Sequence, residues 1–235
     1  MSVKTLQIDG KMVTGGDGDS IFTVAWEHGI HIPRLCHIGG ISDVGACRLC
    51  LVEVEGQRRL QASCLTTVQE GMVVRTDNEK LRAQRKLIVE LLMAERNHVC
   101  SVCVANGACE LQDLAVRLGI DHVRVRYRFP SLPVDLTHER FGMDHNRCIL
   151  CTRCVRVCAE LEGAHVWDIS VRGIRSRITS EMNEKWGMAS TCTSCGKCVQ
   201  ACPTGALAEK GWAVEEMEKK LGTVTSLAQR RGALV

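Results

Sequence analysis

Two quartets of cysteines in the carboxyl-terminal half constrain this chain more than any other feature. The first has the spacing C-x2-C-x2-C-x3-C over residues 148–158, and the second repeats it over residues 192–202, where Pro203 follows. Three thiolates at positions i, i+3 and i+6 of a tight loop can reach three corners of one cubane-shaped iron cluster. The fourth Cys leaves the loop on a helical turn and points away from that cluster, so we expect it to ligate a second one.

The double run resembles that of bacterial two-cluster ferredoxins, in which the fourth Cys of each quartet ligates the other [4Fe–4S] cluster. The resemblance implies a ferredoxin-like domain over residues 139–212. Zinc is the alternative metal, but zinc sites usually use two separated Cys pairs and not two interlocking quartets. One cluster is assigned to Cys148, Cys151, Cys154 and Cys202, and the other to Cys158, Cys192, Cys195 and Cys198.

Residues 1–76 have the pattern of a small β-rich domain. A hairpin-type turn at Asp9-Gly10 follows the first alternating strand, and Gly29 ends a short helix that Asp19 or Ser20 can cap. Strand, hairpin, helix and further strands come in the order of a β-grasp sheet, so we expect an α+β fold. The expected elements are strands at Val3–Ile8, Leu51–Val54, Arg59–Ala62 and Met72–Arg75 and a helix at Ile21–His28.

This domain carries four cysteines with the spacing C-x10-C-x2-C-x13-C, and glycines between the first two suit a backbone that wraps closely around a cluster. The spacing departs from that of plant-type ferredoxins. It resembles the [2Fe–2S] domain of the large iron–sulfur subunit of respiratory complex I and of related hydrogenase subunits. A zinc knuckle is the alternative. The ligands implied for a [2Fe–2S] cluster are Cys36, Cys47, Cys50 and Cys64.

A long helix is predicted after Thr76-x-x-Glu79, which has the form of a capping box. It leads into a C-x2-C-x5-C run at Cys100, Cys103 and Cys109, and a second helix is expected over residues 110–118. Three cysteines are one ligand short of a cluster, and His98 is the nearest residue that can complete the set. The apolar face expected for the long helix comprises Leu81, Leu87, Ile88, Leu91 and Leu92.

Residues 77–119 resemble the [4Fe–4S] module with one His and three Cys ligands that complex I shares with NAD-linked and some iron-only hydrogenases. In most of those relatives the His stands four residues before the first Cys, a position that Arg96 occupies here. His98 stands only two residues before Cys100. It is therefore either the fourth ligand, which we expect, or a hydrogen-bond donor to a sulfur of the cluster.

The cysteine count supports these assignments together. One [2Fe–2S] cluster takes four cysteines, two cubanes take eight, and the His-ligated cluster takes three, which accounts for all 15 in the sequence. The expected load is one [2Fe–2S] and three [4Fe–4S] clusters, or about 14 iron atoms per chain. An odd number of cysteines also argues against a closed set of disulfides.

The remaining segments carry little chemistry. Residues 120–138 are expected to form a linker, and residues 213–235 a charged helix, Ala213–Leu221, followed by a tail. The net charge of +3 gives no reason to expect a nucleic-acid partner. No signal peptide or transmembrane segment is recognisable, so a reduced, cytoplasmic protein is expected. Two further strands are predicted between the quartets, at 164–171 and 176–179.

The order of modules resembles the small iron–sulfur subunit of the diaphorase half of NAD-reducing, bidirectional [NiFe] hydrogenases. That resemblance implies a non-catalytic electron-transfer subunit. Its partners would be a flavin-containing, NADH-oxidising diaphorase subunit, which carries FMN and binds NAD, and the small and large [NiFe] hydrogenase subunits. Two alternatives remain open: the equivalent subunit of an NAD-dependent formate dehydrogenase or a complex I-like assembly, and a freely diffusing polyferredoxin. No catalytic residue is expected on this chain.

Overall fold

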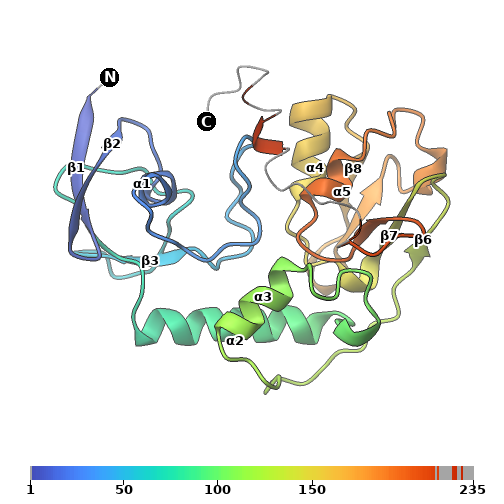
Figure 1. Cartoon of the computed structure of the whole chain (residues 1–235), viewed down its shortest axis with the longest axis horizontal. Helices are drawn as coiled ribbons and strands as arrows, with labels where there is room; N and C mark the ends of the chain where they lie inside the picture. Colours follow the sequence, from blue (N-terminus) through green and yellow to red (C-terminus); the bar gives the residue numbers. More distant parts are fainter. Residues whose placement is uncertain (1, 215, 217–223, 227–228, 230–235) are drawn as a thin grey trace. The chain divides into compact units, whose positions relative to one another are not determined.

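The chain folds into two compact units, each of which contains helices and strands. The computed structural model describes residues 2–214, 216, 224–226 and 229, and Figure 1 shows its helices and strands in sequence colours. The first unit is formed by Met1–His37 and Asp43–Ile88, and the second by Ile38–Ser42 and Val89–Val235. The boundary falls within one long helix, α2 (Glu79–Glu95). No helix among the described residues is long and apolar enough to cross a membrane.

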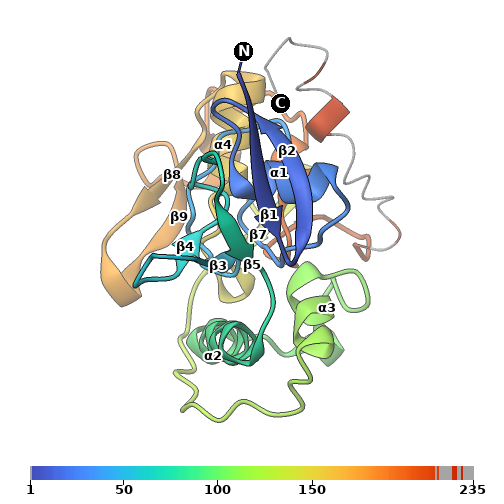
Figure 2. The ribbon, with the colours of Figure 1, turned by 90° about the vertical axis from the view of Figure 1, so that its left-hand side faces the viewer.

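The first unit is built on a five-stranded mixed sheet with the strand order β2-β1-β5-β3-β4. The pair β1 and β5 is parallel, whereas β1–β2, β3–β5 and β3–β4 are antiparallel. Figure 2 shows β1 and β2 side by side at this sheet. The strands are β1 (Val3–Ile8), β2 (Lys11–Gly16), β3 (Leu51–Val54), β4 (Gln61–Ala62) and β5 (Val73–Arg75).

One short helix, α1 (Ile21–Glu27), packs against this sheet. Ser20 caps it, because its hydroxyl accepts a hydrogen bond from the Thr23 amide at 3.1 Å. Inward-facing residues of β1 and α1, such as Leu6 and Ile21, are fully buried in one apolar cluster. The strands and the helix therefore follow the element order predicted from the sequence, with the last two strands shorter than expected.

The helix α2 begins differently from the prediction. The side chain of Asn78, not that of Thr76, caps it, since Asn78 Oδ1 accepts from the Leu81 amide at 2.9 Å. Thr76 instead pairs with Asp9 of the β1–β2 turn, and its amide donates to Asp9 Oδ1 at 2.7 Å. The capping box predicted at Thr76 is wrong because a distant carboxylate binds this threonine.

The buried face of α2 also differs from the expected one. Leu87 and Leu91 are 39% and 49% exposed, while Arg85 and Glu90 are buried. Each buried charge has partners from elsewhere in its own unit. Arg85 donates to the carbonyl oxygens of its neighbours in the first unit, and Glu90 accepts two hydrogen bonds from Arg124, at 2.8 and 3.0 Å.

The second unit contains two small sheets and several short helices. A three-stranded sheet has the order β10-β7-β6, and β8 pairs with β9. The strands are β6 (Val134–Asp135), β7 (Phe141–Asp144), β8 (Trp167–Ser170), β9 (Arg177–Ser180) and β10 (Leu207–Glu209). The helices are α3 (Glu110–Arg117), α4 (Arg153–Arg156) and α5 (Lys197–Ala201), and short helical turns lie at η1 (Cys100–Val102), η2 (His145–Arg147), η3 (Val157–Glu162), η4 (Gly173–Arg175) and η5 (Trp186–Met188).

Cysteine side chains form part of the core of this unit. Cys148, Cys154, Cys158, Cys198 and Cys202 are buried in the same cluster as three aromatic side chains. The strand β6 lies within the segment that was expected to be a linker, where it pairs with β7. The helix predicted at Ala213–Leu221 and the tail lie largely outside the described residues.

Candidate metal centres

The structure brings the predicted ligand residues together in four groups. One group lies in the first unit and three lie in the second. Within the described part of the chain, no three His, Cys, Asp or Glu side chains are arranged to hold a single metal ion.

The group in the first unit comprises two hydrogen-bonded thiol pairs. The Sγ atoms of Cys50 and Cys64 lie 3.5 Å apart, and Cys36 is hydrogen-bonded to Cys47. The bond with Cys36 lowers the pKa of Cys47 to about 6, and the bond with Cys64 lowers the pKa of Cys50 to about 7. One thiol of each pair is therefore readily ionised, which is the state in which cysteine binds metal.

The backbone around these thiols is held from two directions. The Leu35 amide donates to Cys47 Sγ at 3.4 Å. On the other side, the Arg85 guanidinium donates to the carbonyl oxygens of Leu49 at 3.1 Å and Leu51 at 3.0 Å, on either side of Cys50. Gly45 has a left-handed φ of +60°, and a Cβ there would lie 2.5 Å from Leu65 Cδ1, so glycine avoids both backbone strain and a displacement of Leu65.

The second group surrounds a small cavity lined by His98, Cys100, Cys103 and Cys109. His98 Nε2 is buried and has no hydrogen-bond partner among the described residues. Burial, with Arg147 and Arg96 nearby, lowers the pKa of His98 to about 4, so the imidazole is neutral near pH 7. A buried, neutral, unpartnered ring nitrogen beside three thiols has the properties of a metal ligand.

Arg96, four residues before Cys100, has a different role from His98. Its Nε donates to the Cys148 carbonyl at 3.3 Å, and its Nη2 donates to the Ser176 carbonyl at 3.0 Å. The side chain is buried. Arg96 therefore connects the segment before the His98 cavity to the first cysteine of the next group.

The third group contains Cys148, Cys151, Cys154 and Cys202, all of them buried. Burial raises the pKa of Cys148 to about 12 and that of Cys151 to about 11, and the neighbouring thiols add to these shifts. Arginine side chains lie beside this group. Arg153 Nη1 donates to the Ala201 carbonyl at 3.3 Å, and Arg156 Nη2 donates to the Cys151 carbonyl at 3.2 Å.

The loop from Cys202 to Gly205 belongs to two of these groups. Cys202 is in the third group, and the carbonyl of Pro203 accepts a hydrogen bond from the Glu110 amide at 3.0 Å. Glu110 directly follows Cys109 of the His98 cavity. Gly205 lines that cavity, where a Cβ would lie 2.7 Å from Cys103 Sγ. The His98 group and the third group are therefore neighbours in one packed structure.

The fourth group encloses a cavity lined by Cys158, Cys192, Cys195 and Cys198. The fourth cysteine of the first quartet thus lies with the first three of the second, and Cys202 lies with the first three of the first. Trp167 and Trp186 line the same cavity. Burial raises the pKa of the Cys198 thiol, and a hydrogen bond with the Trp167 side chain acts in the opposite direction.

The two cysteine loops have matching backbone conformations. The residue before the second Cys is left-handed in both loops, with φ of +54° at Leu150 and +55° at Ser194. The residue after the second Cys is left-handed as well, with φ of +60° at Thr152 and +70° at Gly196. A β-branched residue rarely adopts this conformation, so the surrounding structure holds Thr152 in a strained state, as is common at functional sites.

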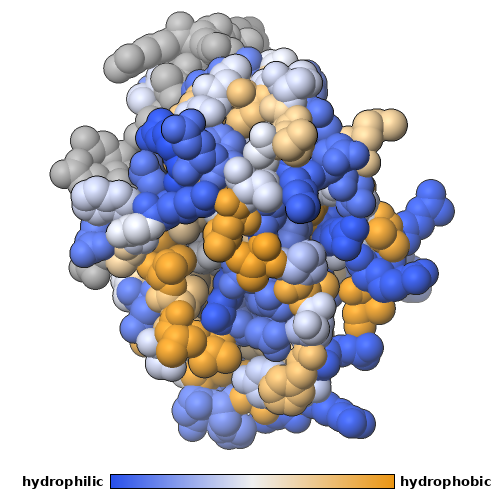
Figure 3. All heavy atoms as spheres, turned by 90° about the vertical axis from the view of Figure 1, so that its right-hand side faces the viewer, coloured by the Kyte–Doolittle hydropathy of each residue, from blue (hydrophilic) through white to orange (hydrophobic). Residues whose placement is uncertain are grey.

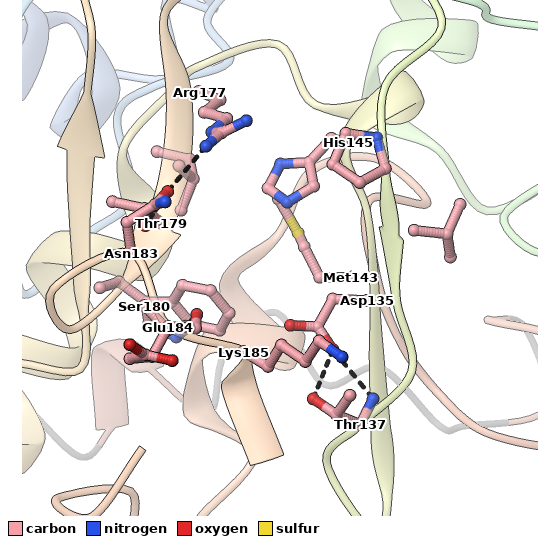
Figure 4. Close-up of a pocket in the computed structure, with 14 residues that line it drawn as sticks. Asp135, Thr137, Met143, His145, Arg177, Thr179, Ser180, Asn183, Glu184 and Lys185 are labelled. Atoms are coloured by element: carbon pink, nitrogen blue, oxygen red, sulfur yellow. Dashed lines mark hydrogen bonds between the residues drawn. The ribbon is translucent and has the colours of Figure 1, made fainter. Parts of the chain in front are cut away.

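A network around β6 fixes the segment that carries Trp186. Asp135 Oδ1 accepts from the Thr137 amide and hydroxyl at 2.9 and 2.6 Å, and Figure 4 shows these two side chains beside Lys185. The other oxygen, Oδ2, accepts from the Trp186 amide at 2.7 Å. No sequence pattern indicates this role, because β6 is short and lies in a stretch without alternating hydrophobicity.

These features define an iron–sulfur protein with several centres, and three family models agree. They are a 2Fe-2S iron–sulfur cluster binding domain over residues 3–79, the NADH-ubiquinone oxidoreductase-G iron–sulfur binding region over residues 85–124, and the ferredoxin-like domain of NADH-quinone oxidoreductase subunit 3 over residues 140–208. The chain belongs to the family of iron–sulfur subunits found in NAD-linked hydrogenases and NADH-quinone oxidoreductases.

Individual relatives match over most of this chain. The gamma subunit of the NAD-reducing hydrogenase HoxS of Cupriavidus necator is 36% identical, over 89% of this chain and 88% of that protein. A crystal structure of an NAD+-reducing [NiFe]-hydrogenase in the H2-reduced state contains a chain with a TM-score of 0.85 and 33% identity, covering 90% of this chain and 89% of that one.

Other relatives are much longer. The NADP-reducing hydrogenase subunit HndD of Solidesulfovibrio fructosivorans is 37% identical over 93% of this chain, which spans 38% of that protein. The mitochondrial NADH-ubiquinone oxidoreductase 78 kDa subunit of Candida albicans is 35% identical over 88% of this chain, and the match spans 28% of that protein. The shared part therefore carries the iron–sulfur modules and not the remainder of those proteins.

Proposed function

We propose that this chain is the electron-transfer subunit of a soluble, cytoplasmic, NAD-linked [NiFe] hydrogenase. It would pass single electrons between a flavin-containing subunit that oxidises NADH and the small and large hydrogenase subunits. The observation that carries the proposal is the packing of the His98 group directly against the third group through the Cys202–Gly205 loop. Such contact places two candidate electron carriers next to each other, and the match to the HoxS gamma chain over 88% of its length supports this assignment.

In this proposal the chain holds one [2Fe–2S] and three [4Fe–4S] clusters, while FMN and NAD bind to the partner subunit. When bound, the clusters accept and release single electrons, at potentials set by ligand type, hydrogen bonds and burial. The ligands are Cys36, Cys47, Cys50 and Cys64 for [2Fe–2S], and for the cubanes His98, Cys100, Cys103 and Cys109; Cys148, Cys151, Cys154 and Cys202; and Cys158, Cys192, Cys195 and Cys198.

The protein supplies positive charge beside the third group. Arg153 and Arg156 are buried, and both lie within the first quartet and donate to backbone carbonyl groups next to its thiols. A cluster with its thiolates is an anion that becomes more negative on reduction. Buried guanidinium groups favour the reduced state, because opposite charges interact strongly where water is excluded.

Exposed apolar surface on the second unit is consistent with a subunit that is covered in a complex. A groove of about 670 Å³ runs beside Cys103 and is lined by exposed apolar side chains that include Val102, Leu136 and Trp212. Figure 3 shows several apolar patches between hydrophilic side chains on one face of the molecule. Patches of this kind mark sites of association in soluble proteins.

Metal analysis of the complex that co-purifies with the tagged chain from its own host tests the proposal. We expect nickel together with a flavin-bearing subunit, and about 14 iron atoms for each copy of this chain beyond those of its partners. Molybdenum or tungsten without nickel would identify the complex as a formate dehydrogenase and not as a hydrogenase. Iron alone, with no partner chains, would contradict the proposal and indicate a free carrier.

A complex I-like assembly is the second candidate, since the 78 kDa chain of the Candida albicans NADH-ubiquinone oxidoreductase matches at 35% identity over 88% of this chain. The same purification separates the two. Membrane subunits and a flavin, with neither nickel nor molybdenum, would favour the quinone-linked assembly.

A further inference from the structure

A buried indole N–H in the second unit has no acceptor. Trp186 is 1% exposed, and its Nε1 has no hydrogen-bond partner among the described residues. An unsatisfied buried donor costs roughly 1–3 kcal/mol, so a folded protein normally supplies an acceptor. The same side chain lines the cavity enclosed by Cys158, Cys192, Cys195 and Cys198.

The three aromatic side chains around the indole offer it no free nitrogen acceptor. Its ring packs against His138, Trp167 and Phe141, with centroids 4.6, 4.7 and 5.7 Å away. His138 Nδ1 accepts from the amides of Arg140 and Phe141 at 3.1 and 3.2 Å, so its Nε2 carries the proton and donates to Ser194 Oγ at 3.2 Å. The cavity that the indole lines offers sulfur atoms as acceptors.

We propose that the Trp186 indole donates a hydrogen bond to a sulfur atom of the [4Fe–4S] cluster bound in this cavity, and thereby raises its reduction potential. The inference rests on the proposed ligation by Cys158, Cys192, Cys195 and Cys198. Trp186 is then a positioning residue that tunes the cluster from outside its ligand set, as hydrogen bonds to sulfur do in other iron–sulfur proteins.

The backbone of Trp186 is anchored on the side away from the cysteines. Its amide donates to Asp135 Oδ2 at 2.7 Å, and Asp135 is itself held by Thr137 (Figure 4). The next residue, Gly187, approaches Thr137 so closely that a Cβ would lie 2.3 Å from its carbonyl oxygen. These contacts fix the turn that carries the indole by groups that are not cluster ligands, so the donor is held in place independently of the metal.

The direction of the effect follows from charge. Reduction adds one electron to an anionic cluster, which makes its sulfur atoms better acceptors, so a donor stabilises the reduced state more than the oxidised one. Replacing Trp186 with phenylalanine keeps an aromatic ring and removes the N–H. We expect the equilibrium constant for reduction to fall roughly tenfold, which is about 59 mV for a one-electron couple.

The test is a redox titration of the Trp186→Phe complex, purified with its partners and followed by electron paramagnetic resonance. The signal to follow is the one that differs between the Cys195→Ser complex and the wild-type complex. A lower potential for this cluster alone, with full iron content, is the expected result. Phe141→Leu is the matched control, because it changes the same wall of the cavity without removing a donor, and its potential should stay near that of the wild type.

A spectroscopic readout keeps the proposal testable even where Trp186→Phe fails to assemble. Tryptophan labelled with 15N in the indole, in a Trp167→Phe background, should show a nitrogen coupling to the reduced cluster by electron–nuclear double resonance. An unchanged potential in Trp186→Phe, or no 15N coupling, overturns the inference. By contrast, full iron content in Cys195→Ser with all signals unaltered would overturn the proposed ligation itself.

Discussion

Arg153 and Glu110 form a two-pronged ion pair in the second unit. Arg153 Nη1 lies 2.6 Å from Glu110 Oε1, and Nη2 lies 2.9 Å from Oε2. Arg153 is 2% exposed and belongs to the first cysteine loop, whereas Glu110 opens α3 next to the His98 cavity. The pair therefore joins two candidate metal centres through charge as well as through the backbone contact at Pro203.

Breaking this pair from one side should destabilise the second unit. Glu110→Gln leaves the Arg153 charge buried without its counter-ion, and we expect a loss of about 3 kcal/mol in the free energy of unfolding. The double variant Glu110→Gln/Arg153→Met removes the stranded charge and should recover part of that loss. Denaturant unfolding under anaerobic conditions measures both. A double variant no more stable than Glu110→Gln alone would contradict this view.

Gly205→Ala should act on the His98 cavity selectively. The added Cβ would meet Cys103 Sγ at 2.7 Å and Ala105 Cβ at 3.1 Å, so the thiol has to move out of place. We expect a loss of about four of 14 iron atoms, with the [2Fe–2S] absorption and circular dichroism of the same sample unchanged. Ala208→Gly, which also changes one methyl group nearby, should retain all its iron. Full iron content in Gly205→Ala would show that the loop can shift without cost.

His98 can be tested as a ligand by two substitutions. His98→Ala should lose the cluster of its cavity, again about four iron atoms, because no other described residue there replaces Nε2. His98→Cys should keep the iron but lower the potential, since replacing imidazole with thiolate adds negative charge. His122→Ala, at an exposed site paired with Asp121, is the control. A His98→Ala protein with its full iron content would show that His98 is not a ligand and is only a hydrogen-bonding neighbour of the cluster.

Removing the metal should make stability depend on alkaline pH. In the metal-free fold, burial raises the pKa of Cys109 and of Cys151 to about 11, from an ordinary value of 9.0. As the pH rises through 9, the unfolded chain loses these protons and the folded chain keeps them. The free energy of unfolding should therefore fall between about pH 9 and pH 11.

The loaded protein provides the comparison for that titration. Its thiols are already ionised and bound to iron, so the same alkaline decline should be absent. Denaturant titrations at several pH values on both forms measure the difference. A metal-free chain whose stability stays level over this range would mean that its cysteines are not buried as described.

How much of the fold the sequence predicts depends on how local the determining interactions are. The strand at Val3–Ile8 follows from alternation, and the end of α1 before Gly29 follows from a left-handed glycine; both are local signals. The cap of α2 does not, because Asp9, 67 residues earlier, binds Thr76 and leaves capping to Asn78. Periodicity alone cannot show that a distant group takes up a side chain.

The same limit applies around the candidate centres. For the quartets at 148–158 and 192–202, the spacing places three thiols of each group on one loop, and the structure brings the fourth from the other quartet. Trp186 and Gly205 were missed, because each acquires its role from a segment far away in the sequence, at Asp135 and Cys103 respectively. The burial of charged residues of α2 could not be predicted for a similar reason, because Arg124, the partner of Glu90, lies 34 residues further on.

The exchange of fourth cysteines between the two loops has a consequence for biosynthesis. Cys158 lies with the second loop and is made early, while the first loop takes its last member from Cys202. The cysteines of the second loop's cavity are complete once residue 198 has been made, whereas the first loop's group is complete only at residue 202. The three thiols of the first loop are therefore without their fourth partner while more than forty further residues are synthesised. A cluster bound by all four cysteines of the first loop's group can therefore form only after residue 202 has been made.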